Sequence, residues 1–163
     1  NGNGVITWPN GDKYTGHWEN DKKHGKGVYI WANGNKYDGD WEFDLRNGFG
    51  IKTWKSGHIY SGQSVKGVRT GRGEYRWANG DTYIGEFKNG MRDGKGIFKW
   101  KNGTIYEGSY KENRREGNGL LKYSNGDIYE GQFRGGNLDG YGKYIWADGR
   151  KYEGLWRAGE MVD

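Results

Sequence analysis

A tyrosine recurs every 23 residues along the whole chain, and this period constrains the fold more than any other feature. Each tyrosine is followed by a glycine two positions later, and all but the last are then followed by a Gly-x-Gly pair and by a dipeptide that ends in glycine. No insertion or deletion interrupts the period. Because such a period is the signature of a repeat architecture, we expect an array of similar units rather than one globular core. The tyrosines are Tyr14, Tyr37, Tyr60, Tyr83, Tyr106, Tyr129 and Tyr152.

Each repeat has the pattern of two β-strands. In residues 36–42, polar residues alternate with Tyr37, Gly39 and Trp41, and the alternation resumes in residues 48–54 after a polar loop. Short runs with a period of two, separated by Asn-Gly, are the strongest local signal for a β-hairpin. Before the last few residues, no stretch has apolar residues at helical spacing. We therefore predict an all-β fold, a single elongated, twisted antiparallel sheet of stacked hairpins with about fourteen short strands.

Two geometries are open for the Asn-Gly turn. A two-residue loop at Asn33 and Gly34 would pair Ile30 with Tyr37. A three-residue loop with Gly34 in the left-handed region would instead pair Tyr29 with Tyr37. The second geometry brings the recurring glycines and aromatic residues to one face and lays each large ring over a glycine of the neighbouring strand. We favour the second geometry for that reason.

The polar loop inside each repeat follows a rule of its own. Its second residue is always glycine, asparagine or aspartate, the types that best tolerate a positive φ. We expect the chain to turn at that residue in every repeat. The residues are Asp21, Asp44, Gly67, Gly90, Asn113, Gly136 and Gly159.

The composition excludes several other classes of protein. The 33 glycines in 163 residues keep no three-residue period and there is one proline, which excludes collagen. The absence of cysteine excludes a disulfide scaffold and a cysteine zinc site, and it fits a reducing, intracellular compartment. The longest apolar run, residues 28–32, is far shorter than the roughly 20 residues of a membrane-spanning helix. Regularly spaced tryptophan and tyrosine argue against disorder.

The pattern Tyr-x-Gly-x-Trp/Phe, then Gly-x-Gly, then Trp-x-Asn-Gly resembles MORN repeats. The resemblance covers one continuous array over residues 1–163. It comprises a partial repeat at 1–13, repeats that begin at residues 14, 37, 60, 83, 106 and 129, and a partial repeat at 152–163. It implies a single sheet of stacked hairpins and a cytoplasmic scaffold associated with the cytoskeleton or a membrane. Because the chain begins and ends within a repeat, we interpret it as a segment of a longer array.

Three departures from the repeat pattern fall close together. Ser64 stands where other copies have an aromatic residue, Ser56 replaces the asparagine of the turn, and Thr70 replaces the His, Asn, Asp or Glu that other copies have before Gly-x-Gly. All three lie in residues 56–70, where we expect a bend or a slack joint.

No set of residues supports catalysis, a cofactor or a metal. The Gly-x-Gly pairs never complete Gly-x-Gly-x-x-Gly, and no predicted helix follows them to hold a phosphate. His17, His24 and His58 occupy three different repeat positions, so they form no repeated ligand set. We expect a non-enzymatic protein.

Aromatic residues at three repeat positions form the first candidate binding surface. A single sheet has no second layer, so the rings must in part form its core. Such a sheet cannot bury both sides of its rings, and an exposed apolar strip usually marks a partner site. We predict that this face binds a protein segment, either a helix or an extended peptide. The predicted residues are Tyr14, Trp18, Trp31, Tyr37, Trp41, Trp54, Tyr60, Trp77, Tyr83, Phe87, Trp100, Tyr106, Tyr110, Tyr123, Tyr129, Phe133, Trp146, Tyr152 and Trp156, and Trp8 occupies the same register as Trp31.

A row of cations forms the second candidate surface. One loop position repeats lysine or arginine, and we expect these side chains along one long edge of the sheet. They would either solubilise the rim, which we favour, or bind anionic phospholipids such as phosphoinositides as a membrane-targeting module. A net charge of +5 is too dilute for nucleic acid. The five cations are Lys23, Arg46, Arg69, Arg92 and Arg115.

The end strands offer a third surface. Each end strand of an open sheet has backbone groups without a partner, so two copies would form a homodimer by pairing their terminal repeats. We expect Leu155 and Trp156 to lie uncovered on the last strand.

Overall fold

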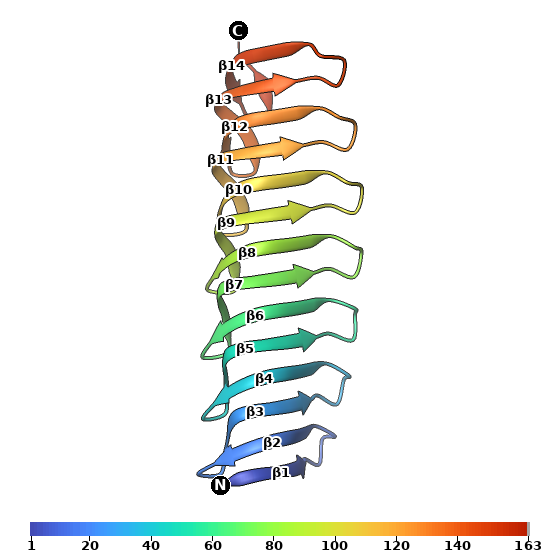
Figure 1. Cartoon of the computed structure of the whole chain (residues 1–163), viewed down its shortest axis with the longest axis vertical. Helices are drawn as coiled ribbons and strands as arrows, with labels where there is room; N and C mark the ends of the chain where they lie inside the picture. The colour runs from blue at the N-terminus through green and yellow to red at the C-terminus, as the bar shows by residue number, and fades with distance from the viewer. Residues whose placement is uncertain (163) are drawn as a thin grey trace. The chain divides into compact units, whose positions relative to one another are not determined.

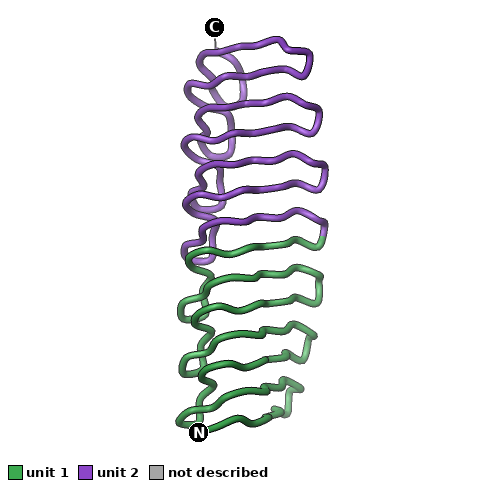
Figure 2. The backbone as a smooth tube through the Cα atoms, viewed as in Figure 1, with its two compact units in different colours: residues 1–78 green, residues 79–163 purple. Residues whose placement is uncertain are grey.

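The computed structural model describes residues 1–162, which form strands and turns but no helix. The strands make one open antiparallel sheet of 15 strands, each following the last in sequence order, so the predicted all-β fold is confirmed (Figure 1). The chain divides into two compact units, residues 1–78 and 79–163 (Figure 2). None of the described residues belongs to a helix long and apolar enough to cross a membrane.

Both units are built from the same hairpin, and their strands alternate in length between seven and nine residues over most of the chain. Unit 1 contains β1 (Gly2–Thr7), β2 (Lys13–Glu19), β3 (Lys22–Ile30), β4 (Lys36–Glu42), β5 (Leu45–Thr53), β6 (Ile59–Val65) and β7 (Val68–Arg76). Unit 2 contains β8 (Thr82–Lys88), β9 (Met91–Lys99), β10 (Ile105–Lys111), β11 (Arg114–Lys122), β12 (Ile128–Arg134), β13 (Asn137–Ile145), β14 (Lys151–Arg157) and the two-residue β15 (Glu160–Met161).

The three-residue loop predicted for the Asn-Gly turn is confirmed. The Trp31 N–H donates to the Asn35 carbonyl and the Gly34 N–H donates to the Trp31 carbonyl, each at 2.9 Å. Gly34 has a φ of +97°, in the left-handed region that favours glycine. Tyr29 consequently lies opposite Tyr37 on the neighbouring strand.

The turn inside each repeat is shorter than the sequence indicated. Only Phe43 and Asp44 separate β4 from β5, and both have positive φ, 44° and 74°. The expected positive φ at the second residue is therefore present, but the first residue shares it, as a type I′ turn requires. Because the turn is tight, Trp41 lies directly opposite Arg46. The second strand begins at Leu45, three residues before the predicted start at residue 48.

The core consists of tyrosines that lie over glycines of the next strand. Tyr37 is 2% exposed, and its hydroxyl donates to the Asp40 carbonyl at 3.2 Å. A Cβ on Gly50 would overlap the Tyr37 ring, and a Cβ on Gly39 would overlap the backbone of Gly50, which lies opposite. Ring and backbone approach so closely that neither glycine has room for a side chain.

The two glycines of each Gly-x-Gly pair have different purposes. Gly50, the second, makes room for the tyrosine ring. Gly48, the first, has a φ of +105° where the register between β4 and β5 shifts. A shift of this kind bends a strand, and a positive φ is easily reached only by glycine.

A bend or a slack joint was expected at residues 56–70, but the strand pairing there is regular. Ser64 lies opposite Gly48 on one side and Arg69 on the other, the same pairing as in the regular repeats. Gly57 keeps the positive φ of its turn, +100°. The pairing continues because Tyr60 and the glycines of the pattern are intact, and the three departures change only side chains.

Trp156 is not uncovered as expected. It is 7% exposed, because Met161 of β15 pairs with it and the rings of Tyr129 and Tyr144 each lie 5.6 Å from its own. Leu155, which points the other way, is 56% exposed.

The contact between tyrosine and glycine yields a stability prediction. Gly50→Ala should lower the free energy of unfolding by about 2 kcal/mol, because the added methyl group overpacks the Tyr37 ring. Urea unfolding followed by tryptophan fluorescence measures the change.

Gly4→Ala is the matched control. Gly4 occupies the same repeat position, but no tyrosine ring covers it, and its nearest contact would be Trp18 Cδ1 at 3.7 Å. We expect a change within about 0.5 kcal/mol. Equal losses in the two variants would contradict the proposed role of the ring.

Candidate protein-binding surface

The predicted aromatic residues divide into buried inner rings and a partly exposed outer row. The outer row is Trp8, Trp31, Trp54 and Trp77 in unit 1, and Trp100, Tyr123 and Trp146 in unit 2. The inner rings, at most 7% exposed, are Tyr14, Tyr37, Trp41 and Tyr60 in unit 1, and Tyr83, Phe87, Tyr106, Tyr110, Tyr129, Phe133 and Trp156 in unit 2. Trp18 and Tyr152 are partly exposed.

The inner rings pack edge to face. In unit 1, the Trp41 ring lies 5.6 Å from Tyr14 and 5.2 Å from Tyr37, nearly perpendicular to both. In unit 2, Tyr110 has the same place between Tyr83 and Tyr106, at 5.3 and 5.2 Å. Edge-to-face packing suits the ring quadrupole. These rings supply the core of a one-layer sheet, and the outer row is what remains accessible.

Further rings join the members of the outer row. Tyr29 lies 5.5 Å from Trp8 and 4.7 Å from Trp31, so the three form a continuous aromatic surface in unit 1. In unit 2, Tyr144 lies 5.9 Å from Tyr123 and 4.8 Å from Trp146. We call these joining positions the middle row.

Sequence analysis did not single out the middle row as part of the surface. Its signal was present, because the three-residue loop that we favoured brings Tyr29 opposite Tyr37. The residue type varies from repeat to repeat, which hides the position from a search for recurring residues. The middle row is Tyr29, Lys52 and Tyr75 in unit 1, and Phe98, Leu121 and Tyr144 in unit 2.

An aspartate anchors the loop that carries an outer tryptophan. Asp12 accepts hydrogen bonds from the Tyr29 hydroxyl and from the Ala32 N–H, both at 2.7 Å. These two donors hold the pKa of Asp12 below its usual value. The pKa of Tyr29 is raised to about 12, mainly by burial and also by its hydrogen bond to the Asp12 carboxylate. Asp127 repeats the arrangement with Tyr144 in unit 2. The anchored loop holds its tryptophan in a fixed position.

The five predicted cations lie over the aromatic rings, not along an edge of the sheet. The Arg46 guanidinium lies 5.7 Å from the Tyr37 ring and donates to the Gly67 carbonyl at 3.2 Å. The expected position was wrong because it assumed a longer loop; the type I′ turn sets Arg46 opposite Trp41, and opposite residues share a face. Each of the other four is 5.2–5.4 Å from a ring: Lys23, Arg69, Arg92 and Arg115.

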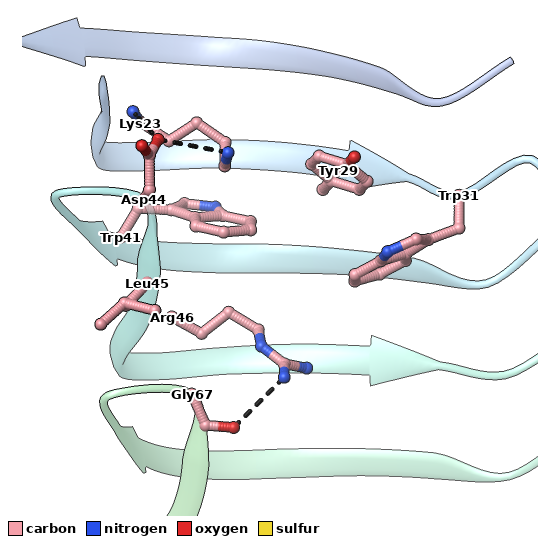
Figure 3. Close-up of a pocket in the computed structure, with 8 residues that line it drawn as sticks. All are labelled: Lys23, Tyr29, Trp31, Trp41, Asp44, Leu45, Arg46 and Gly67. Carbon is pink, nitrogen blue, oxygen red and sulfur yellow. Dashed lines mark hydrogen bonds and ion pairs between the residues drawn. The ribbon is translucent and has the colours of Figure 1, made fainter. Parts of the chain in front are cut away.

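Unit 1 contains an open pocket of about 260 Å³ between its rings and its cations (Figure 3). Tyr29, Trp31 and Trp41 line it with aromatic surface, and Arg46 borders it. Lys23 also lines the pocket, but its charge is paired, since its Nζ lies 3.2 Å from an Asp44 carboxylate oxygen. Asp44, Leu45 and Gly67 complete the lining. The pocket can hold an apolar side chain.

Lys52 interrupts the aromatic surface of unit 1. It occupies the middle row, where its ammonium nitrogen lies 5.1 Å from the Trp31 ring and 4.7 Å from the Trp54 ring. Burial, and then the positive charges of Arg46 and Arg69, lower the pKa of Lys52 to about 8. A cation therefore stands between two tryptophans of the outer row.

The histidines make local contacts at three separate places. His58 Nδ1 accepts a hydrogen bond from the Ala78 N–H at 2.9 Å, and His24 Nε2 lies 3.4 Å from a Glu19 carboxylate oxygen. The His17 side chain lies against Gly25. Over residues 1–162, no three His, Asp or Glu side chains gather as a metal site would require.

The pKa of Lys52 predicts how stability changes with pH. It falls from an ordinary 10.5 to about 8 on folding, so between these values the unfolded chain binds a proton that the folded chain has lost. The free energy of unfolding should therefore rise as pH increases through that window. Urea midpoints between pH 7 and pH 9.5 measure the rise.

Lys52→Met should flatten this rise, whereas Lys55→Met, which removes an exposed lysine of the same unit, should keep it. A slope that Lys52→Met leaves unchanged would contradict the assignment to Lys52.

The MORN repeat family model matches seven consecutive stretches of the chain, residues 1–13, 14–36, 37–59, 60–82, 83–105, 106–128 and 129–149. No curated protein gives a significant match. Among solved structures, the TCP domain of Drosophila melanogaster SAS-4 in complex with a proline-rich motif of Ana2 aligns at a TM-score of 0.51 and 16% identity, over 94% of this chain and 78% of that one. The TCP10c domain of Drosophila melanogaster Sas-4 aligns at a TM-score of 0.52 and 13% identity, over 95% of this chain and 93% of that one. Likeness at this identity establishes the shared fold alone.

Proposed function

Because the chain belongs to the MORN repeat family, we propose that it is a non-catalytic scaffold that binds a segment of another protein along its outer row. The observation that carries this proposal is the partial exposure of the outer row at every repeat, beside inner rings that the fold buries. As the resemblance to MORN repeats implies, we propose a cytoskeletal or membrane-associated setting inside the cell.

The outer row suits a protein partner for two physical reasons. Tryptophan and tyrosine dominate the energetics of protein interfaces, because each buries a large area and loses little rotamer freedom. Anchoring of the loops, as by Asp12 on the loop of Trp31, keeps the side chains in a binding-competent position before the partner arrives. The buried Tyr37 and its equivalents contribute by supporting this surface.

An extended segment fits this surface better than a globular domain. Proline-rich segments adopt the polyproline II conformation and dock on aromatic surfaces with little loss of entropy. The SAS-4 TCP domain, which shares the fold, was solved with a proline-rich motif of Ana2. That complex supports the use of such a sheet as a peptide receptor, and we propose an extended partner segment for this chain.

The alternative is a membrane-binding role for the five cations. Their positions disfavour it, since Lys23 is paired with Asp44 and the Arg46 guanidinium lies over the Tyr37 ring. The cations lie over the aromatic rings, whereas a basic stripe along one edge of the sheet would present its charges openly to a flat membrane. Binding to anionic phospholipids is therefore the second candidate function.

Peptide selection tests the scaffold proposal. Twelve-residue peptides are selected from a random displayed library on the intact chain, and their dissociation constants are measured by fluorescence anisotropy. Trp31→Ala and Trp54→Ala should each weaken binding of the peptides that contact unit 1 at least tenfold, because truncation of a buried tryptophan at an interface costs roughly 2 kcal/mol.

Phe49→Ala is the matched control, because Phe49 is an aromatic residue of unit 1 that is 47% exposed on the opposite face from Gly50. Circular dichroism confirms that each variant folds. Peptides that bind both tryptophan variants as tightly as the original chain would refute the proposal.

Flotation with liposomes tests the alternative. We expect that the intact chain does not float with phosphoinositide-containing liposomes at near-physiological salt, since the cations are engaged on the aromatic face. Flotation that weakens as the salt concentration rises would favour the membrane-binding function.

The pairing of two copies through their end strands stays a prediction. Light scattering on the intact chain, over a range of concentrations, distinguishes a monomer from a dimer.

A further inference from the structure

Two departures from the repeat pattern meet on the aromatic face of unit 1. Lys52 replaces a middle-row residue that is aromatic at Tyr29 and Tyr75. Ser64, 6% exposed, replaces the inner ring that Trp41 supplies one repeat earlier. Both departures substitute a polar side chain for apolar surface, and β5 and β6, which carry them, are paired.

Lys52 belongs to a cluster of three cations, which we call the cation cluster: Arg46, Lys52 and Arg69. Lys52 lies opposite Tyr37 on β4 and opposite Tyr60 on β6. The Arg46 guanidinium lies 5.7 Å from the Tyr37 ring, and the Arg69 guanidinium lies 5.6 Å from the Tyr60 ring. A guanidinium therefore lies over each of the two tyrosines that Lys52 faces across the strands.

All three side chains of the cluster are cations. Within the described part of the chain, neither Arg46 nor Lys52 forms an ion pair with an acidic side chain. The influences that lower the pKa of Lys52 are burial and the two neighbouring arginines. The Arg46 side chain donates a hydrogen bond to the Gly67 carbonyl, although a guanidinium carries five N–H groups. Like charges held together at partly buried positions repel one another unless an anion joins them.

The excess of positive charge is also concentrated in this unit. Residues 1–78 hold 12 Lys and Arg against 8 Asp and Glu, whereas residues 79–163 hold 14 against 13. In unit 2 the middle row is Phe98, Leu121 and Tyr144, without a cation. The cluster is thus a particular feature of unit 1 and not a property of the repeat.

We infer that the segment bound by unit 1 is acidic, with a Glu or Asp side chain seated in the cation cluster between Trp31 and Trp54. This inference rests on the proposed function and names the chemistry of its partner. The pocket bordered by Trp31 and Arg46 accepts a neighbouring apolar side chain of the same segment (Figure 3). Lys52 is flanked by two tryptophans. A peptide in which acidic and apolar side chains alternate is complementary to this arrangement in both charge and polarity.

Two matched peptide pools test the inference. In the first pool of fluorescein-labelled 12-residue peptides, Glu alternates with an equal mixture of Pro, Leu and Trp; in the second, Gln replaces every Glu. Anisotropy titrations with the intact chain should give at least tenfold tighter binding of the Glu pool at low salt. The difference should narrow as salt rises, because screening weakens charge pairing.

Variants at one residue identify the site. Lys52→Tyr restores the residue type of Tyr29 and Tyr75, so it should fold and should lose the preference for the Glu pool. Lys52→Gln should lose it as well. Lys55→Gln removes the same charge from an exposed position of the same unit and should keep the preference.

The outcomes separate this inference from the scaffold proposal. Equal binding of both pools, weakened by Trp31→Ala, would overturn the inference while the scaffold proposal stands. Failure of both pools to bind would overturn the inference and count against the scaffold proposal. A Glu preference that survives Lys52→Tyr and Lys52→Gln would also overturn it. A fourth result would overturn the inference: the two pools bind equally, and the chain binds anionic vesicles in a manner that depends on Lys52. The cluster would then be a membrane-binding site.

Discussion

The fold depends on the contact between a tyrosine ring and the bare backbone of the next strand. Tyr37 covers Gly50, and its hydroxyl donates to the Asp40 carbonyl. The ring obtains burial from a strand that has no side chain at that point, and the hydroxyl satisfies an acceptor at the bend. A sheet without a second layer has no other way to bury large apolar groups. The 23-residue period follows, because the tyrosine and its glycine must recur together.

The cations complete this arrangement from the solvent side. Arg46 covers the Tyr37 ring with its planar guanidinium and remains partly hydrated at its edge. In a fold with two layers, a second sheet or a helix would cover the same ring. The same side chain reaches the Gly67 carbonyl and so links one repeat to the next. A position that resembles a solubilising charge in the sequence therefore acts as part of the core's cover.

Sequence reasoning was sufficient for the hairpin, the three-residue loop and the family, because each depends on residues that recur at a fixed position. It failed at the turn of Phe43 and Asp44, because phenylalanine is not a residue type that indicates a positive φ. Because of that single error, the prediction placed Arg46 along the edge of the sheet instead of on the aromatic face. The middle row was missed for a related reason, because its position is constant but its residue type is not.

Recurrence and departure thus carry different information in a repeat protein. The recurring tyrosine and glycines determine the backbone, and any residue that preserves them leaves the pairing intact, as Ser64 does. Side chains that depart from the pattern without disturbing it are available for recognition. Lys52 is of this kind, because it keeps the register of its strand yet brings a charge between two tryptophans. Its position costs some stability through burial and repulsion, and an acidic partner would offset that cost upon binding.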